Sequence, residues 1–193
     1  MIDAALRKMT LGFLNKSKDA YETIDAWLKK LALPVLISTA NAAEFKQQLQ
    51  GVDLCPDLLI VDSASKHTLQ QINNACGPNH TARFFVINSP VRDPNLAEVY
   101  GWCEWPCKES QFQKCLVIAL RTLRRIKSLE QALIDEKLLL DATKILWETQ
   151  PETYSTINLA YKGVKDLATK HRRTISEEAK SIINEYKKRK KRP

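Results

Sequence analysis

The sequence predicts an α/β domain with a five-stranded parallel sheet, then a long helix and a small all-α domain. Short β-type runs alternate with helical patterns through residues 1–108, and this spacing indicates parallel strands with helices on both faces. A helical pattern without glycine or proline follows, and two short amphipathic patterns come after it. We therefore divide the chain into four parts. They are residues 1–108, a connector at 109–137, a helical domain at 138–186 and a basic tail at 187–193.

The elements of the first domain are read in order along the chain. The expected strands are Thr10–Leu14, Val35–Ser38, Leu58–Val61, Phe84–Ile87 and Trp102–Trp105. The expected helices are Ala20–Leu31, Ala43–Leu49 and Leu69–Ala75, with a short segment Asn95–Tyr100 and a long helix from about Glu109. The strands alternate with these segments, as a parallel sheet requires.

The third predicted strand resembles a known family. The run from Pro56 to Asp62, PDLLIVD, is similar to the third strand of the receiver domains of two-component regulators, which have a flavodoxin-like fold. In that family the strand ends on the phosphoacceptor aspartate, here Asp62. The carboxyl end of a buried parallel strand is also where such sheets place functional groups. Trp105-Pro106 is a second match, at the place where receivers have lysine-proline.

The chemistry that the resemblance implies is incomplete in this chain. Receivers hold a divalent cation with an acidic pair after the first strand, because the incoming phosphate needs its charge offset. The equivalent positions here are Asn15 and Lys16, and Trp105 replaces the later lysine. We therefore expect a pseudo-receiver in which Asp62 is inactive, with no metal and no cofactor.

Positive charge is confined to the second half of the chain. Residues 1–110 carry 11 Lys and Arg against 12 Asp and Glu, whereas residues 111–193 carry 19 against 10. Such asymmetry favours a polyanionic partner for the second half, since neutralising phosphates releases counterions. The alternative is a solvated helical surface with a soluble tail.

The last two helical patterns meet at a cluster of bases. Ala160, Val164, Leu167 and Ala168 form one helical face, and Ile175, Ala179, Ile182 and Ile183 form the next. The cluster Lys170 to Arg173 lies at the turn between them, and Thr174 or Ser176 can cap the second helix. The sequence thus presents cations where two helices join.

This stretch resembles the ANTAR domain, the helical RNA-binding module of AmiR/NasR-type transcription antiterminators. The matching features are Ala160-Tyr161, the run Val164 to Ala168, the basic turn and a closing apolar helix, preceded by a helix from Leu138 to Leu146. The family favours asparagine in the basic turn, where this chain has Arg172. The resemblance implies binding to a leader RNA hairpin and control by a separate ligand-sensing protein. The candidate RNA-contacting residues are Lys144, Lys165, Lys170, Arg172 and Arg173, and Ala142, Ala160, Ala168 and Ala179 are expected to allow close helix packing.

The connector has a coiled-coil spacing. Leu116, Leu120, Leu123, Ile126, Leu129 and Leu133 recur at intervals of three and four residues. We expect this face to pair with a second copy, giving a homodimer through residues 109–137. The alternative is that it packs on the first domain of the same chain.

Other chemistries receive less support. Cys103, Cys107 and Cys115 are expected to be buried apolar thiols rather than a metal site, and the aromatic ring of Tyr161 is expected in the core. No glycine-rich phosphate loop or nucleophile elbow is present, so we expect no enzyme. An odd number of cysteines, no signal-like start and no apolar run of about 18 residues favour a cytoplasmic protein without membrane contact.

The sequence therefore predicts a transcription antitermination regulator that binds a leader hairpin as a dimer. Two rivals remain open. One is a response regulator whose last two helices bind DNA, and the other is a signalling protein that depends on phosphorylation of Asp62.

Overall fold

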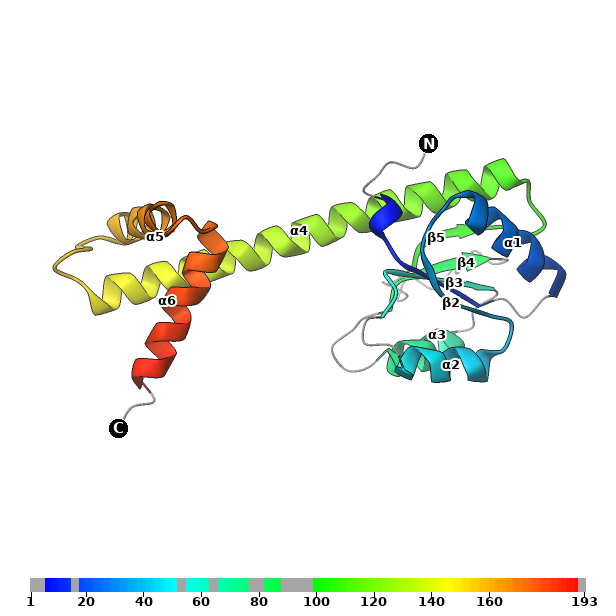
Figure 1. The fold of residues 1–193 in the computed structure, drawn as a ribbon, viewed down its shortest axis with the longest axis horizontal. Coiled ribbons are helices and arrows are strands. Elements are labelled where there is room, and N and C mark those ends of the chain that lie inside the picture. The colour runs from blue at the N-terminus through cyan, green and yellow to red at the C-terminus, as the bar shows by residue number, and fades with distance from the viewer. Residues whose placement is uncertain are drawn as a thin grey trace. The chain divides into compact units, whose positions relative to one another are not determined.

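A computed structural model of the chain describes residues 6–14, 18–51, 55–62, 66–76, 82–87 and 99–190 (Figure 1). Two compact units are present, Met1–Arg125 and Ile126–Pro193. The long helix α4 (Glu109–Thr149) begins in the first unit and ends in the second. Each unit has its own hydrophobic core.

The first unit contains the five-stranded parallel sheet that the sequence predicts. Its strands are β1 (Leu11–Leu14), β2 (Val35–Thr39), β3 (Leu58–Asp62), β4 (Phe84–Ile87) and β5 (Val99–Cys103). They lie in the order β2-β1-β3-β4-β5, and every neighbouring pair is parallel. This is the flavodoxin-like order of receivers, so the predicted receiver-like fold is confirmed.

Helices cover both faces of this sheet (Figure 1). A short 3₁₀ turn, Leu6–Lys8, precedes β1, and the helices are α1 (Lys18–Lys30), α2 (Ala42–Gly51), α3 (Lys66–Ala75) and the start of α4. On one face, Ile24 and Leu28 of α1 pack with Phe112 of α4, and all three are fully buried. On the other face, Phe45 of α2 packs with Ile72 of α3. The α/β layering follows from strands that are apolar on both sides.

The last strand differs from its predicted position. It spans Val99–Cys103 rather than Trp102–Trp105, because Gly101 is part of the strand rather than a break before it. A Cβ at Gly101 would lie 2.9 Å from the Cβ of Ala119 and 3.1 Å from the Phe85 ring, so only glycine lets α4 approach this strand so closely. The expected segment Asn95–Tyr100 lies outside the described residues except for its last two, which belong to β5.

Helix α4 is continuous as predicted, but the expected seam is divided. Leu116, Leu120 and Leu123 are fully buried in the core of the first unit, so this part of the face packs on its own sheet. The expectation that it pairs with a second copy is therefore wrong for these three leucines. Leu129 and Leu133, in the second unit, are 61% and 69% exposed. Of the predicted seam, Leu129 and Leu133 are thus left exposed.

The second unit is a small helical domain made of the last part of α4 with α5 (Ile157–His171) and α6 (Ile175–Lys190). Its core contains Leu146 and Val164, with Tyr154 packed at its edge. The four alanines predicted to allow close packing, Ala142, Ala160, Ala168 and Ala179, are all buried. Small residues at these positions bring the helix backbones close together.

Candidate nucleic-acid interface

The turn between α5 and α6 carries an unusual backbone conformation. Arg172 ends α5 with φ 54° and ψ 43°, the left-handed region in which glycine or asparagine is usual. Its N–H donates to the carbonyl of Thr169 at 3.2 Å, and the Arg173 N–H donates to that of Ala168 at 2.9 Å. These two bonds form a Schellman motif with Arg172 in the glycine position. An arginine there is strained, and its side chain is exposed.

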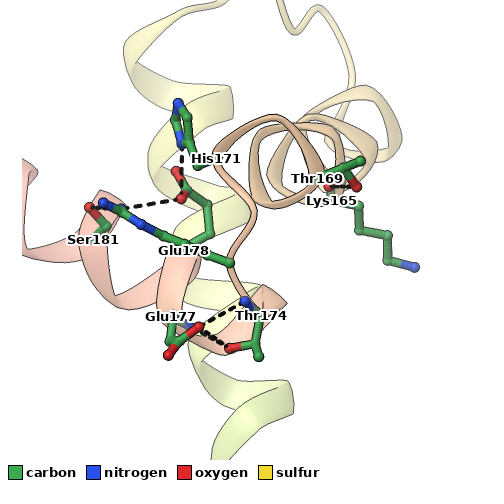
Figure 2. Close-up of polar contacts among 8 residues, drawn as sticks. Lys165, Thr169, His171, Thr174, Glu177, Glu178 and Ser181 are labelled. Atoms are coloured by element: carbon green, nitrogen blue, oxygen red, sulfur yellow. Dashed lines mark hydrogen bonds and ion pairs between the residues drawn. The ribbon is translucent and has the colours of Figure 1, made fainter.

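Thr174, not Ser176, caps the start of α6. The Glu177 N–H donates to the Thr174 hydroxyl oxygen at 3.2 Å, while the Thr174 N–H donates to Glu177 Oε2 at 2.8 Å (Figure 2). This reciprocal pair is a capping box. The hydrogen bond from the Thr174 N–H, followed by that from its hydroxyl, lowers the pKa of the Glu177 carboxyl from its ordinary value. The box fixes where α6 begins and so fixes the basic turn.

A buried carboxylate lies next to the cap. Glu178 is 3% exposed, and its Oε2 lies 3.0 Å from Nδ1 of His171 and 3.5 Å from Nη1 of Arg173 (Figure 2). The same Arg173 nitrogen donates to Oγ of Ser181 at 3.3 Å. The guanidinium of Arg173, a predicted RNA contact, is therefore tied to the fold of α6 as well as half exposed.

Tyr161 and Lys165 lie one turn apart on the same side of α5, and Arg172 follows the last residue of that helix. We call these three residues the α5 stripe. The Lys165 Nζ lies 4.2 Å from the centroid of the Tyr161 ring, a cation–π contact. The expectation that Tyr161 is a core residue is wrong, since it is 37% exposed and the core side of α5 is filled by Ala160 and Val164. An exposed ring between cations suits stacking on an unpaired base.

The other two predicted contacts lie apart from the α5 stripe. Lys170 lines a hollow of about 290 Å³ together with Lys162 and Asp166. Lys144, on α4, is exposed and pairs with Glu148 at 3.8 Å, an exposed ion pair of little energetic weight. Among the described residues, no ion pair or hydrogen bond joins the Lys144 side chain to α5 or α6. The structure thus places Lys165 beside Tyr161, Lys170 at the hollow and Lys144 beside Glu148.

Sequence reasoning missed two features of this unit. Trp147, three residues after Lys144, is 42% exposed. Lys162 accompanies Lys170 at the hollow. The signal for both was present in the sequence, because positions 162, 166 and 170 recur every fourth residue, while Trp147 falls a heptad after Leu140.

In the first unit, Asp62 ends β3 and pairs in register with Ile87 of β4. Its side chain lies outside the described part of the structure, as do Asn15 and Lys16. Trp105 is described and packs against Trp27 of α1, with ring centroids 5.8 Å apart. The residue that replaces the receiver lysine is therefore part of the aromatic packing.

The expectation of buried thiols is right for Cys103 but not for Cys107 and Cys115, which are half-buried. Cys103 is buried, and Cys107 and Cys115 pack against the same core. Burial, followed by the neighbouring Cys107 thiol 3.5 Å away, raises the pKa of Cys103 to about 12. Among the described residues, no group of three or more metal-ligating side chains is found. The described helices also include none long and apolar enough to cross a membrane.

The comparisons with known proteins agree with the fold of the first unit. No family model matches the sequence, and no curated protein matches it. A receiver domain protein from Clostridium thermocellum is similar in structure, with TM-score 0.47 and 15% identity over 63% of this chain and 98% of that one. The N-terminal domain of a response regulator/sensory box/GGDEF protein from Carboxydothermus hydrogenoformans is similar too, with TM-score 0.46 and 17% identity over 60% and 97%. At these scores the assignment rests on the strand order, which is that of a receiver-like, flavodoxin-like domain.

Proposed function

We propose that this chain is a transcription antitermination regulator that binds a structured leader RNA hairpin as a dimer. The observation that carries the proposal is Arg172, a strained left-handed residue with an exposed guanidinium at the centre of a basic turn. Strain of this kind persists where function requires the residue. Leu138–Ile183 resembles the ANTAR domain, and this resemblance is the reason why RNA is proposed as the ligand.

The α5 stripe is the proposed centre of RNA contact. Arg172 and Lys165 contact phosphates of a hairpin loop, while the Tyr161 ring stacks on an unpaired base. Lys170 and Lys144 contribute charge from neighbouring surfaces. Arg173 has a double role, because it also pairs with the buried Glu178.

The proposed dimer seam lies on the second part of α4. Ile126, Leu133, Leu140 and Trp147 recur at heptad spacing, and the last three are 69%, 56% and 42% exposed. Leu133→Glu with Leu140→Glu should give a monomer by sedimentation, because both charges would enter the seam. Ser128→Glu, on the opposite side of the helix, is the matched control and should remain a dimer. A wild-type monomer at micromolar concentration would refute the dimer.

Control is proposed to come from a ligand-sensing protein partner rather than from phosphorylation. The support is chemical: Asn15 and Lys16 cannot supply a carboxylate pair for a divalent cation, and Trp105 is packed on Trp27. Beryllium fluoride with magnesium mimics a phosphorylated aspartate. It should leave the thermal unfolding of the first unit unchanged, and a magnesium-dependent rise in stability would favour a phosphorylation-dependent regulator instead.

No enzymatic activity is proposed for the chain. The main alternative function is a response regulator that binds duplex DNA through α5 and α6. A helix-turn-helix reads bases with polar residues at the start of its second helix, whereas α6 begins with the capping box and the buried Glu178. This arrangement favours RNA over duplex DNA.

Binding across a salt series distinguishes these functions. The purified chain is titrated with RNA hairpins and with duplex DNA of matched charge. Tighter, loop-dependent binding to RNA supports the proposal, and equal, steeply salt-sensitive binding to both ligands contradicts it. Arg172→Ala and Lys165→Ala should each lower the salt slope by about 1, as loss of one phosphate contact does. Lys114→Ala, an exposed cation of the first unit, is the control.

A further inference from the structure

A pocket of about 420 Å³ lies in the second unit, where the end of α4 meets α5 and α6. Its apolar lining comes from Ile145, Leu146, Leu167 and Ile182, and Tyr186 contributes an aromatic ring. This volume falls within the range of pockets that hold small organic groups. The pocket is separate from the α5 stripe, since none of the three stripe residues lines it.

Charged side chains of both signs line the pocket. Glu178, His171 and Glu185 line it, and Glu178 is nine-tenths or more buried. Both partners of Glu178 contact Oε2, and among the described residues no donor to Oε1 is found. A carboxylate accepts hydrogen bonds from N–H donors. An occupant must therefore present donors to the interior.

Cations lie next to the same ring. Arg189 and Lys190 also line the pocket, and the Lys190 Nζ lies 5.5 Å from the centroid of Tyr186. An aromatic ring, one buried and one exposed carboxylate and neighbouring cations together match three parts of one nucleotide. The ring stacks on a base, a carboxylate accepts from its amino group, and the cations attract its phosphate.

We propose that this pocket binds one unstacked nucleobase that carries an exocyclic amino group, supplied by the loop of an RNA hairpin. The inference rests on the proposed RNA-binding function and adds a base-reading site to it. Guanine fits best, because its N1–H and amino group lie on one edge and can both donate to a carboxylate. Uracil fits worst, because its single N–H is flanked by two carbonyl oxygens that the carboxylates repel.

The test uses the full-length chain and hairpins that share one stem and a uridine loop. A single G, A or C is placed at each loop position in turn. We expect the best G-containing hairpin to bind about tenfold more tightly than the all-uridine hairpin, as a bidentate base contact does. This ratio should persist at higher salt, because base contacts release no counterions. An all-uridine loop that binds as tightly as every substituted loop would overturn the proposal.

Variants separate the pocket from the rest of the surface. Tyr186→Ala should abolish the preference for the G-containing loop, while Tyr186→Phe keeps the ring and should retain it. Glu185→Ala should reduce the preference and avoids the risk of unfolding that accompanies any change at the buried Glu178. Arg172→Ala is the control, since it should weaken all hairpins equally. Retention of the full preference in both Tyr186→Ala and Glu185→Ala would refute the pocket.

A direct readout uses 2-aminopurine in place of the preferred base. Its fluorescence should fall on binding, through contact with the Tyr186 ring, and should not fall in Tyr186→Ala. If all hairpins bind alike but more tightly than duplex DNA, the pocket proposal fails and the RNA-binding function stands. If no hairpin binds more tightly than duplex DNA, the RNA-binding function itself fails.

Discussion

Replacing Arg172 by glycine should make the second unit more stable and the protein a weaker RNA binder. Arg172 holds φ 54° and ψ 43°, a conformation that costs a residue with a Cβ about 1 kcal/mol. Glycine removes this cost but gives the unfolded chain more freedom, which offsets part of the gain. The expected net stabilisation is about 0.5–1 kcal/mol.

Hydrogen exchange of peptides from α5 and α6 measures this change without interference from the first unit. A gain of about 1 kcal/mol slows exchange through local opening by about fivefold. RNA affinity should fall several-fold at the same time, and the salt slope should fall by about 1, because one phosphate contact is lost.

Arg172→Ala is the matched variant. Alanine loses the guanidinium but keeps a Cβ in the left-handed region, so it should weaken RNA binding as glycine does without slowing exchange. Two results would refute the reasoning. One is equal exchange in the alanine and glycine variants, and the other is unchanged RNA affinity in both.

Four further predictions concern stability and reactivity. Gly163→Ala should destabilise the second unit, although alanine normally favours a helix, because its Cβ would overlap the Tyr154 ring; urea unfolding measures this. Thr174→Ala should cost about 1 kcal/mol in the same assay. The pKa of Glu177 is lowered in the folded state, so its contribution to the free energy of unfolding is present above the ordinary pKa of about 4.3 and is lost as the pH falls through the lowered value. Glu177→Gln should therefore make the stability of the second unit depend less on pH in this acid range. With a pKa of about 12, Cys103 should resist alkylation at neutral pH until the chain is unfolded, as mass spectrometry would show.

The sheet was predictable because its strands carry strong local signals. Leu58 to Asp62 and Phe84 to Ile87 are short apolar runs, and both form strands within one residue of the predicted bounds. The predicted position of the last strand was wrong because a glycine such as Gly101 can be interpreted in two opposite ways. A glycine in a strand pattern marks a break or a close approach, and only the packing of Ala119 against it decides between them.

The exposure of the long helix was not predictable from its pattern. Leu123 and Leu133 belong to one continuous series of apolar positions, yet the first is fully buried and the second is 69% exposed. A heptad pattern predicts that an apolar helix face is buried but does not identify the surface that buries it. The sheet of the same chain buries this helix face as far as Leu123, and the apolar pattern continues past the end of that contact.

The conformation of Arg172 was also not predictable from the sequence, because a basic residue at a helix end usually indicates only a favourable interaction with the helix dipole. The ANTAR family favours asparagine at this position, and the left-handed backbone gives the replacement by arginine a structural consequence. Asparagine tolerates this conformation and arginine does not, so the chain retains a strained cation where a relaxed residue is available. The buried Glu178 lies in the first turn of α6. It pairs with Arg173 and His171 but not with Arg172. The structure therefore neutralises one arginine of the turn within the fold and leaves the other exposed, which is why Arg172 rather than Arg173 is the sharper test of RNA contact.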